Sequence, residues 1–202
     1  MTTFTDHTLR AYLEELSSEK PVPGGGSVSA YVAALAMGLT QMVGRVSVKR
    51  KKKAGMRPEE EKKDTEKREM IARIVESLEK TKRDAFQIVD LDPKVYEEVM
   101  RTWGEEDKME DALQNSFRLQ ADLTLLVVMA NEWNHHMAHL VTGSIKNDLL
   151  VSAGLLEAAF KGAYHTAMIN VCYMKNKEAK KRSEKALEEL KKRFEKGNES
   201  GN

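Results

Sequence analysis

Three consecutive glycines lie in one short stretch of the chain, Pro21–Ser27, which reads Pro-Val-Pro-Gly-Gly-Gly-Ser. The two prolines are expected to end the preceding helix, and the glycines permit backbone angles that other residues avoid. Ser27 is a good N-cap for the apolar segment that follows. A glycine-rich loop before a helix offers N–H groups and the positive end of the helix dipole, so it could bind an anion, a carboxylate or a polarised carbonyl. A tight corner between two helices explains the same residues without a ligand.

Three further polar residues lie where they could take part in chemistry. Asp92 directly precedes Pro93, which predicts a helix that starts there with Asp92 as its N-cap. Asp148 lies near another predicted helix start, and capping is the simplest role for both carboxylates. Asn170 lies inside an apolar helical pattern, so it must find hydrogen-bond partners if it is buried.

A histidine cluster and a single cysteine are the remaining candidates. Glu132 and His135 have the Glu-x-x-His spacing of di-iron bundles, and His135 and His139 are four residues apart. A second Glu-x-x-His motif is absent, and so is the His-Glu-x-x-His of zinc proteases. We therefore predict no metal site, although a metal-binding bundle stays open as a function class. Cys172 lies in an apolar pattern and is expected to be a core residue.

A run of five basic residues, Lys49–Lys53, follows the apolar segment. Such a run is usually a solvated part of the surface. Its place directly after a buried helix also allows a second interpretation, in which it receives a polyanionic tail.

The spacing of apolar residues is helical throughout, and no strand pattern is found. The segment 27–48 is apolar and small nearly all round, which is typical of a central buried helix. We predict an all-α bundle of about six to seven helices. Residues 1–176 are expected to form the main domain and 177–202 a charged C-terminal helix with a frayed tail. The predicted helices cover 4–20, 27–48, 58–90, 93–103, 112–141, 147–173 and 175–196.

Composition narrows the function classes. The chain has 202 residues, with 33 Lys and Arg against 32 Asp and Glu, so its net charge is +1 and indicates no nucleic-acid partner. The N-terminal residues lack the apolar region of a signal peptide, and no apolar run reaches the ~18–20 residues that we expect of a membrane span. One cysteine excludes an intrachain disulfide. These features predict a soluble cytoplasmic protein.

Several of these blocks match one family. The loop Pro21–Ser27 before a small-residue helix resembles the cyclodeaminase domain of formiminotransferase-cyclodeaminase and the stand-alone methenyltetrahydrofolate cyclohydrolases of the same superfamily. The basic run resembles the family's lysines after that helix. Residues 92–100 resemble its Asp-x-x-Ala-Phe-x-x-Val-Met block. Gly143 with Asn147 and Asp148 is similar to its Gly-Asn…Ser-Asp loop, and 167–171 is similar to its stretch around a helical Asn. The resemblance spans roughly residues 5–175.

The resemblance implies a folate one-carbon enzyme that forms a homodimer and needs no cofactor besides its tetrahydrofolate substrate. A cyclodeaminase closes 5-formiminotetrahydrofolate to the 5,10-methenyl cation with loss of ammonia, and a cyclohydrolase adds water to that cation to give 10-formyltetrahydrofolate. Asp92 is the expected catalytic carboxylate, since it can stabilise a cation and move protons. The substrate, in its mono- or polyglutamylated form, is expected to contact Pro23, Gly24, Gly25, Gly26, Ser27, Lys49, Lys51, Lys53, Asp148 and Asn170.

Departures from the family pattern leave one alternative open. Arg45 stands where the family usually has Asn, and the loop from Gly143 to Asp148 is about two residues short. The alternative is a non-catalytic helical scaffold, or a folate-binding protein, that kept the fold.

Overall fold

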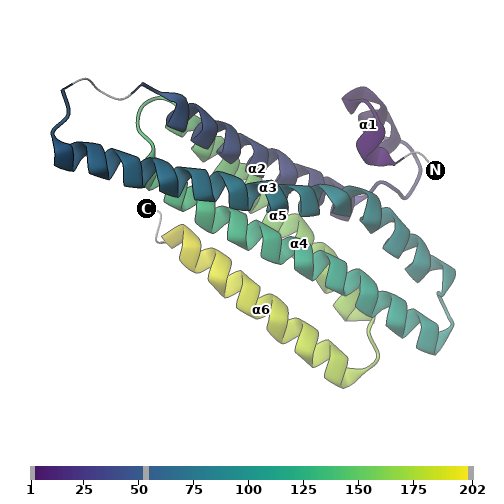
Figure 1. Cartoon of the computed structure of the whole chain (residues 1–202). Coiled ribbons are helices and arrows are strands. Elements are labelled where there is room, and N and C mark those ends of the chain that lie inside the picture. Colours follow the sequence, from purple (N-terminus) through teal and green to yellow (C-terminus); the bar gives the residue numbers. More distant parts are fainter. Residues whose placement is uncertain (1–2, 52–54, 200–202) are drawn as a thin grey trace.

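The computed structural model describes residues 3–51 and 55–199, and all regular structure within them is helical (Figure 1). This confirms the predicted all-α class. A 3-10 turn, η1, precedes six α-helices. Their bounds are η1 (Phe4–Asp6), α1 (Leu9–Leu16), α2 (Gly25–Lys49), α3 (Pro58–Arg101), α4 (Glu106–Leu140), α5 (Lys146–Tyr173) and α6 (Lys177–Glu199).

Helix α2 lies at the centre of the bundle and contacts α3, α4 and α5. Its small side chains allow this, because Ala30, Ala33 and Ala36 are fully buried and bring neighbouring backbones close. Helix α5 runs antiparallel to it: Gly162 lies against Ser29 near the start of α2, and Ser152 bonds Thr40 further along. The prediction of a central small-residue helix is confirmed.

Helix α3 is continuous through Pro93, so the predicted break at Asp90–Pro93 is wrong. The 44-residue helix ends at Arg101, and Gly104 with a φ of +91° makes the turn into α4. Asp92 is therefore a mid-helix residue and not an N-cap. Helix α4 also begins earlier than the predicted residue 112, because the polar segment from Glu106 onward is already helical.

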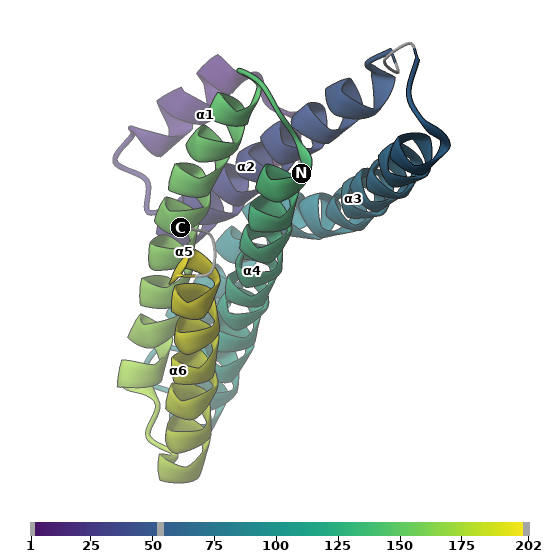
Figure 2. The same cartoon turned by 90° about the vertical axis from the view of Figure 1, so that its left-hand side faces the viewer.

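The two terminal helices are attached differently. Helix α6 lies along the outside of α4 (Figures 1 and 2), where Leu187 is buried and the ring of Phe194 stacks on Phe160 at 4.1 Å. Helix α1 lies apart from the bundle at one end (Figure 1). It is capped by Thr8, whose side chain accepts from the Ala11 amide, and its buried residue is Tyr12.

By length and composition alone, α2 could span a membrane, contrary to the expectation from the sequence. Most of its apolar stretch is buried against the other helices of the bundle. The central helix of a water-soluble bundle passes the same test, so this feature is weak support for a membrane span.

Candidate active site

Asp92 is buried where the start of α2 meets the C-terminal part of α3, with 7% of its surface exposed. One carboxylate oxygen accepts a hydrogen bond from the Ser27 backbone amide at 2.9 Å. The other accepts from the Gln120 side-chain amide of α4 at 2.7 Å. Three helices therefore meet at this carboxylate. Asp92 therefore caps the start of α2, although it belongs to α3 and lies 65 residues further along the chain.

Pro93 explains why Ser27 sits there. Proline has no N–H, so the carbonyl of Val89, four residues earlier in α3, loses its helical donor. The Ser27 hydroxyl donates to that carbonyl at 2.9 Å. Because this uses the only proton of the hydroxyl, the Tyr12 hydroxyl at 3.1 Å must donate to Ser27. Ser27 thus lies in the first turn of α2 as an anchor to α3, whereas Gly24 is the N-cap.

The glycine-rich loop serves close approach and not unusual backbone angles. None of Gly24, Gly25 and Gly26 has a positive φ, so the expectation of left-handed backbone there is wrong. A Cβ on Gly26 would lie 2.1 Å from Asp92 Oδ1 and 2.4 Å from Gln120 Nε2, which no side chain could tolerate. A Cβ on Gly25 would meet nothing closer than Thr166 Oγ1 at 3.9 Å. Only a glycine fits at position 26, directly over the carboxylate. Pro23, which directly precedes the three glycines, is buried.

The surroundings of Asp92 favour proton transfer over charge pairing. Its two hydrogen-bond donors are neutral amides, and no salt bridge to it is found in residues 3–51 and 55–199. Burial raises the pKa of the Asp92 carboxyl, and the bonds from Ser27 and Gln120 offset only part of this rise. A carboxyl whose pKa is moved toward neutrality is suited to take and return a proton.

Gln120 is a site residue that the sequence reading missed. It is fully buried, and its Oε1 has no hydrogen-bond partner in the described part of the chain. If its amide turns over, Oε1 faces Asp92 and can accept from a protonated carboxyl. Gln120 can therefore serve both protonation states of Asp92. The available signal was a glutamine inside an apolar helical stripe, but nothing local joined it to residue 92.

Tyr12 was also missed, because it reads as one of several apolar positions in a short helix. Burial raises the pKa of its hydroxyl, which keeps it protonated as the donor to Ser27. It ties α1 to the start of α2.

The other predicted contacts fall at both ends of the bundle. Asn170 of α5 is buried and donates to the Thr166 carbonyl one turn earlier. Since Thr166 lies beside Gly25, Asn170 is at the same end of the bundle as Asp92. Asp148 lies in the first turn of α5, where the positive end of the helix dipole stabilises a carboxylate. Because α5 is antiparallel to α2, Asp148 is at the opposite end from Asp92.

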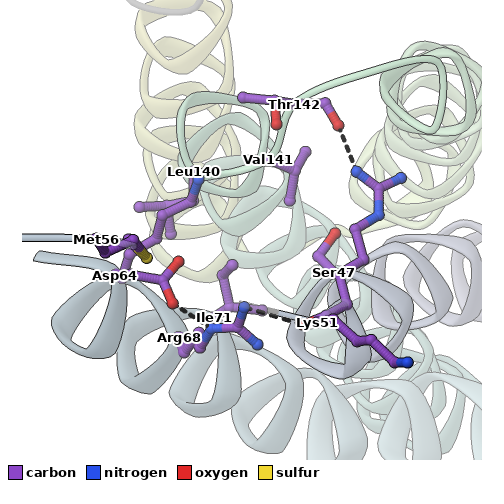
Figure 3. A pocket seen from close by; sticks show the side chains of 11 residues that line it. Ser47, Lys51, Met56, Asp64, Arg68, Ile71, Leu140, Val141 and Thr142 are labelled. Carbon is purple, nitrogen blue, oxygen red and sulfur yellow. Dashed lines mark hydrogen bonds and ion pairs between the residues drawn. The ribbon is translucent and has the colours of Figure 1, made fainter. Parts of the chain in front are cut away.

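The basic run is at that opposite end too. Lys49 is the last residue of α2, Lys51 lines a cavity of about 370 Å³, and Lys53 lies outside the described residues. Figure 3 shows the cavity between α2, α3 and the segment after α4. Its cationic lining residues are Arg50, Lys51, Lys67 and Arg68.

Both arginines of this lining are held by hydrogen bonds to backbone carbonyls or a carboxylate. Arg50 donates to the Thr142 carbonyl at 2.9 Å, and Arg68 donates to Asp64 at 2.6 Å as well as to the carbonyls of Val48 and Arg50. Lys67 is half-buried and has no ion pair among the described residues. The cavity is therefore a positively charged hollow, about 33 Å from Ser27 at 1.5 Å per helical residue.

The histidines line a separate cavity between α4 and α6. The lining includes His135, His136, His139 and Glu132. Two guanidinium nitrogens of Arg193 donate to the two carboxylate oxygens of Glu132, at 2.7 and 2.8 Å. Among the described residues, however, no three His, Cys, Asp or Glu side chains lie so that they could hold one metal ion together. Cys172 is exposed, so its predicted place in the core is wrong.

Comparisons with known proteins agree with the resemblance. Residues 8–189 match the family model described as formiminotransferase-cyclodeaminase. Formimidoyltransferase-cyclodeaminase from Mus musculus is 28% identical over 177 residues, and that from Gallus gallus is 29% identical over 175. These matches cover 82% and 81% of this chain but only 31% and 30% of the relatives, so the chain spans about a third of their length.

A solved structure shares the fold over almost the whole chain. Formiminotetrahydrofolate cyclodeaminase from Thermotoga maritima superposes with a TM-score of 0.86 at 22% sequence identity, covering 97% of this chain and 94% of that one. The family model covers the glycine loop, Asp92 and Gln120 together. The chain belongs to the formiminotransferase-cyclodeaminase family.

Proposed function

We propose that this protein is a folate one-carbon enzyme that forms 5,10-methenyltetrahydrofolate from the 5-formimino derivative and releases ammonia. The observation that carries the proposal is the Asp92 carboxylate, buried without a cation beneath Gly26 and held by two neutral amides. The mouse relative is a formimidoyltransferase-cyclodeaminase and the Thermotoga maritima structure is a formiminotetrahydrofolate cyclodeaminase, which supports this reaction over hydrolysis of the methenyl form.

The reaction needs one proton to change place. N10 attacks the carbon of the formimino group in its protonated, amidinium form, which forms the N10–C bond, moves the C=N electron pair onto the nitrogen and gives a tetrahedral carbon between N5 and N10. The proton from N10 must then reach the amino group on that carbon before the C–N bond breaks and ammonia leaves. The methenyl cation remains. Asp92 is the group that takes the proton from N10 and delivers it, and its negative charge stabilises the cation.

The start of α2 contributes to binding in this proposal. Of the amides that precede its first intrahelical hydrogen bond, that of Ser27 is occupied by Asp92. The amides of Gly24, Gly25 and Gly26 are the donors for a pterin oxygen, and Asn170 lies at the same end of the bundle. Asp148 is too far along the bundle to share in this contact.

The methenyl absorbance distinguishes the candidate activities. A cyclodeaminase produces this absorbance from 5-formiminotetrahydrofolate. A cyclohydrolase removes it from added methenyltetrahydrofolate faster than buffer alone. If neither signal changes while folate still binds, the chain is the folate-binding scaffold that the loop departures allow, and the proposal fails.

We also propose that the protein acts as a homodimer. Support comes from α5, where large apolar side chains face outward: Leu150 is 73% exposed, Val151 55% and Ile169 60%. Large apolar side chains exposed on one helix are consistent with a protein–protein contact. Light scattering at micromolar concentration should give twice the chain mass, and a monomer there would contradict the proposal.

A further inference from the structure

A groove between α2 and α3 has no role in the site described so far. It encloses about 310 Å³ and lies beside Tyr31, Ala34 and Leu35 of α2. From α3 it is lined by Glu79, Lys82, Arg83 and Phe86, which follow helical spacing along one face. The groove thus runs lengthwise between two rigid helices.

The groove continues toward Asp92. Tyr31 and Phe86 also line a small cavity shared with Tyr12, whose hydroxyl bonds Ser27. The rings of Tyr12 and Tyr31 are 5.5 Å apart, and those of Tyr31 and Phe86 are 6.1 Å apart. A row of aromatic rings therefore joins the groove to the carboxylate. Lys82 and Arg83 precede Asp92 by ten and nine residues, about 15 Å along the axis of α3.

The walls of the groove are apolar and left open. Leu35 is 48% exposed and Phe86 37% exposed, so neither finds a full apolar partner within the chain. A flat aromatic group would cover both, and aromatic pairs gain from such contacts beyond the area they bury.

The end of the groove away from Asp92 is positively charged. Lys82 donates to Gln41 at 2.8 Å and to Glu79 at 3.1 Å, and Arg45 donates to the same Glu79 oxygen at 2.9 Å. Arg83 is exposed and has no ion pair or hydrogen bond with the other described residues. The side chains of Lys82, Arg83 and Arg45 carry three positive charges and Glu79 carries one negative charge, so this end of the groove has a net charge of +2.

An apolar slot with aromatic walls and a cationic end fits an aryl group that carries carboxylates at its far side. We propose that the groove binds the aminobenzoyl-glutamate arm of the folate, with Arg83 and Lys82 holding the first glutamate and the pterin directed toward Asp92. This inference rests on the proposed function. The first glutamate then binds at Lys82 and Arg83, and not at the basic run. These residues lie about 15 Å from Asp92 along α3, a distance that one folate molecule can span.

Replacing Arg83 tests the proposal on the intact chain. Arg83→Ala should raise the KM for the folate monoglutamate at least fivefold and change kcat less than twofold, because the contact is remote from the reacting carbon. Arg83→Lys should recover part of the loss. The matched control is Arg73→Ala, an exposed arginine of the same helix outside the groove, which should leave KM unchanged.

Binding of p-aminobenzoyl-glutamate alone provides a second readout. Calorimetry should show that the parent prefers this acid to its neutral diamide, and that Arg83→Ala removes the preference. Equal KM values for Arg83→Ala and Arg73→Ala in an active enzyme would overturn the groove assignment and leave the proposed function intact. A parent without folate turnover or binding would instead refute the function. If Leu35→Lys halves the mass in solution without changing KM, a second copy of the chain covers the groove and the proposal is wrong.

Discussion

The two ends of α2 hold opposite kinds of charge in opposite ways. At the glycine end, one buried carboxylate is bound by neutral amides from two other helices. At the basic end, four cationic side chains surround an open cavity, and two of them, Arg50 and Arg68, are held by carbonyls and Asp64. The first arrangement suits proton transfer, because its two donors are neutral and do not stabilise the charged form as a cation would. The second suits the binding of anions. In the proposed function, reaction and polyglutamate binding are therefore separated by the length of one helix.

The largest effect should follow the loss of the Asp92 proton site. We expect Asp92→Asn to lower kcat at least about 100-fold, since a positioned acid–base group contributes 10²–10⁴ in rate. Stability should be kept. The Asn oxygen can still accept from Ser27, and its amide can donate to Gln120 Oε1 once that side chain turns over. Folate affinity should be largely unchanged.

The carboxylate at the other end is the control for this change. Asp148→Asn should keep the parent rate, because Asp148 lies in the first turn of α5 away from the glycine end. If Asp92→Asn keeps more than about a tenth of the parent rate, Asp92 only caps α2. Asp148 would then be the next candidate, and the contrast between the two ends would be lost.

A single methyl group over the carboxylate should also be costly. Gly26→Ala places a carbon 2.1 Å from Asp92 Oδ1, so α2 and α3 must move apart. Overpacking of this kind destabilises by about 1–3 kcal/mol. Thermal unfolding should show a lower Tm, and kcat should fall with it. Gly25→Ala adds the same methyl group at an ordinary contact distance of 3.9 Å from Thr166 and should leave Tm unchanged, and an equal loss of Tm would disprove the close-approach role of Gly26.

At the basic end, we expect an effect on substrate length and not on chemistry. Replacing Lys49, Lys51 and Lys53 by Ala should weaken polyglutamylated folate several-fold and leave the monoglutamate unaffected. The reason is that one glutamate held near Asp92 cannot reach about 33 Å along α2. The difference should shrink at high salt. An equal loss for both forms would make the run a solvated surface segment.

The smallest effect concerns Glu79, midway between the ends. Hydrogen bonds from Gln41, Lys82 and Arg45 lower the pKa of Glu79 to about 2. A lowered folded-state pKa means that its stabilising effect is complete above the unfolded pKa near 4.5 and is lost as the pH falls toward 2. Glu79→Gln should therefore lower Tm slightly at pH 6 and not at pH 2, because the side chain is 40% exposed. A Tm difference that is independent of pH would contradict this.

Local sequence signals predicted the helices well and the site only in part. The small-residue pattern located α2 and α5, because their burial is encoded in the residues themselves. Asp92 was found through a motif, but its setting was misread. Asp-Pro signals a helix start when only neighbouring residues are considered, whereas the helix continues because Ser27, 62 residues earlier, bonds the Val89 carbonyl. Gln120 shows the same limit, since its contact with Asp92 depends on packing between helices.

The missing N–H of Pro93 has a consequence for how α2 and α3 are aligned. A helix of alanines and glycines presents a smooth surface that can slide along its neighbour at little cost. Here the Val89 carbonyl receives its bond where Ser27 stands, and one oxygen of the Asp92 carboxylate receives its bond from the Ser27 amide. A shift by one turn, about 5.4 Å, would leave the Val89 carbonyl without this partner and the Asp92 carboxylate with only its bond from Gln120, at about 1–3 kcal/mol for each lost bond. The proline thus helps to fix one alignment of α2 and α3 at the glycine end, and the bonds of Gln41 and Arg45 to α3 hold it further along.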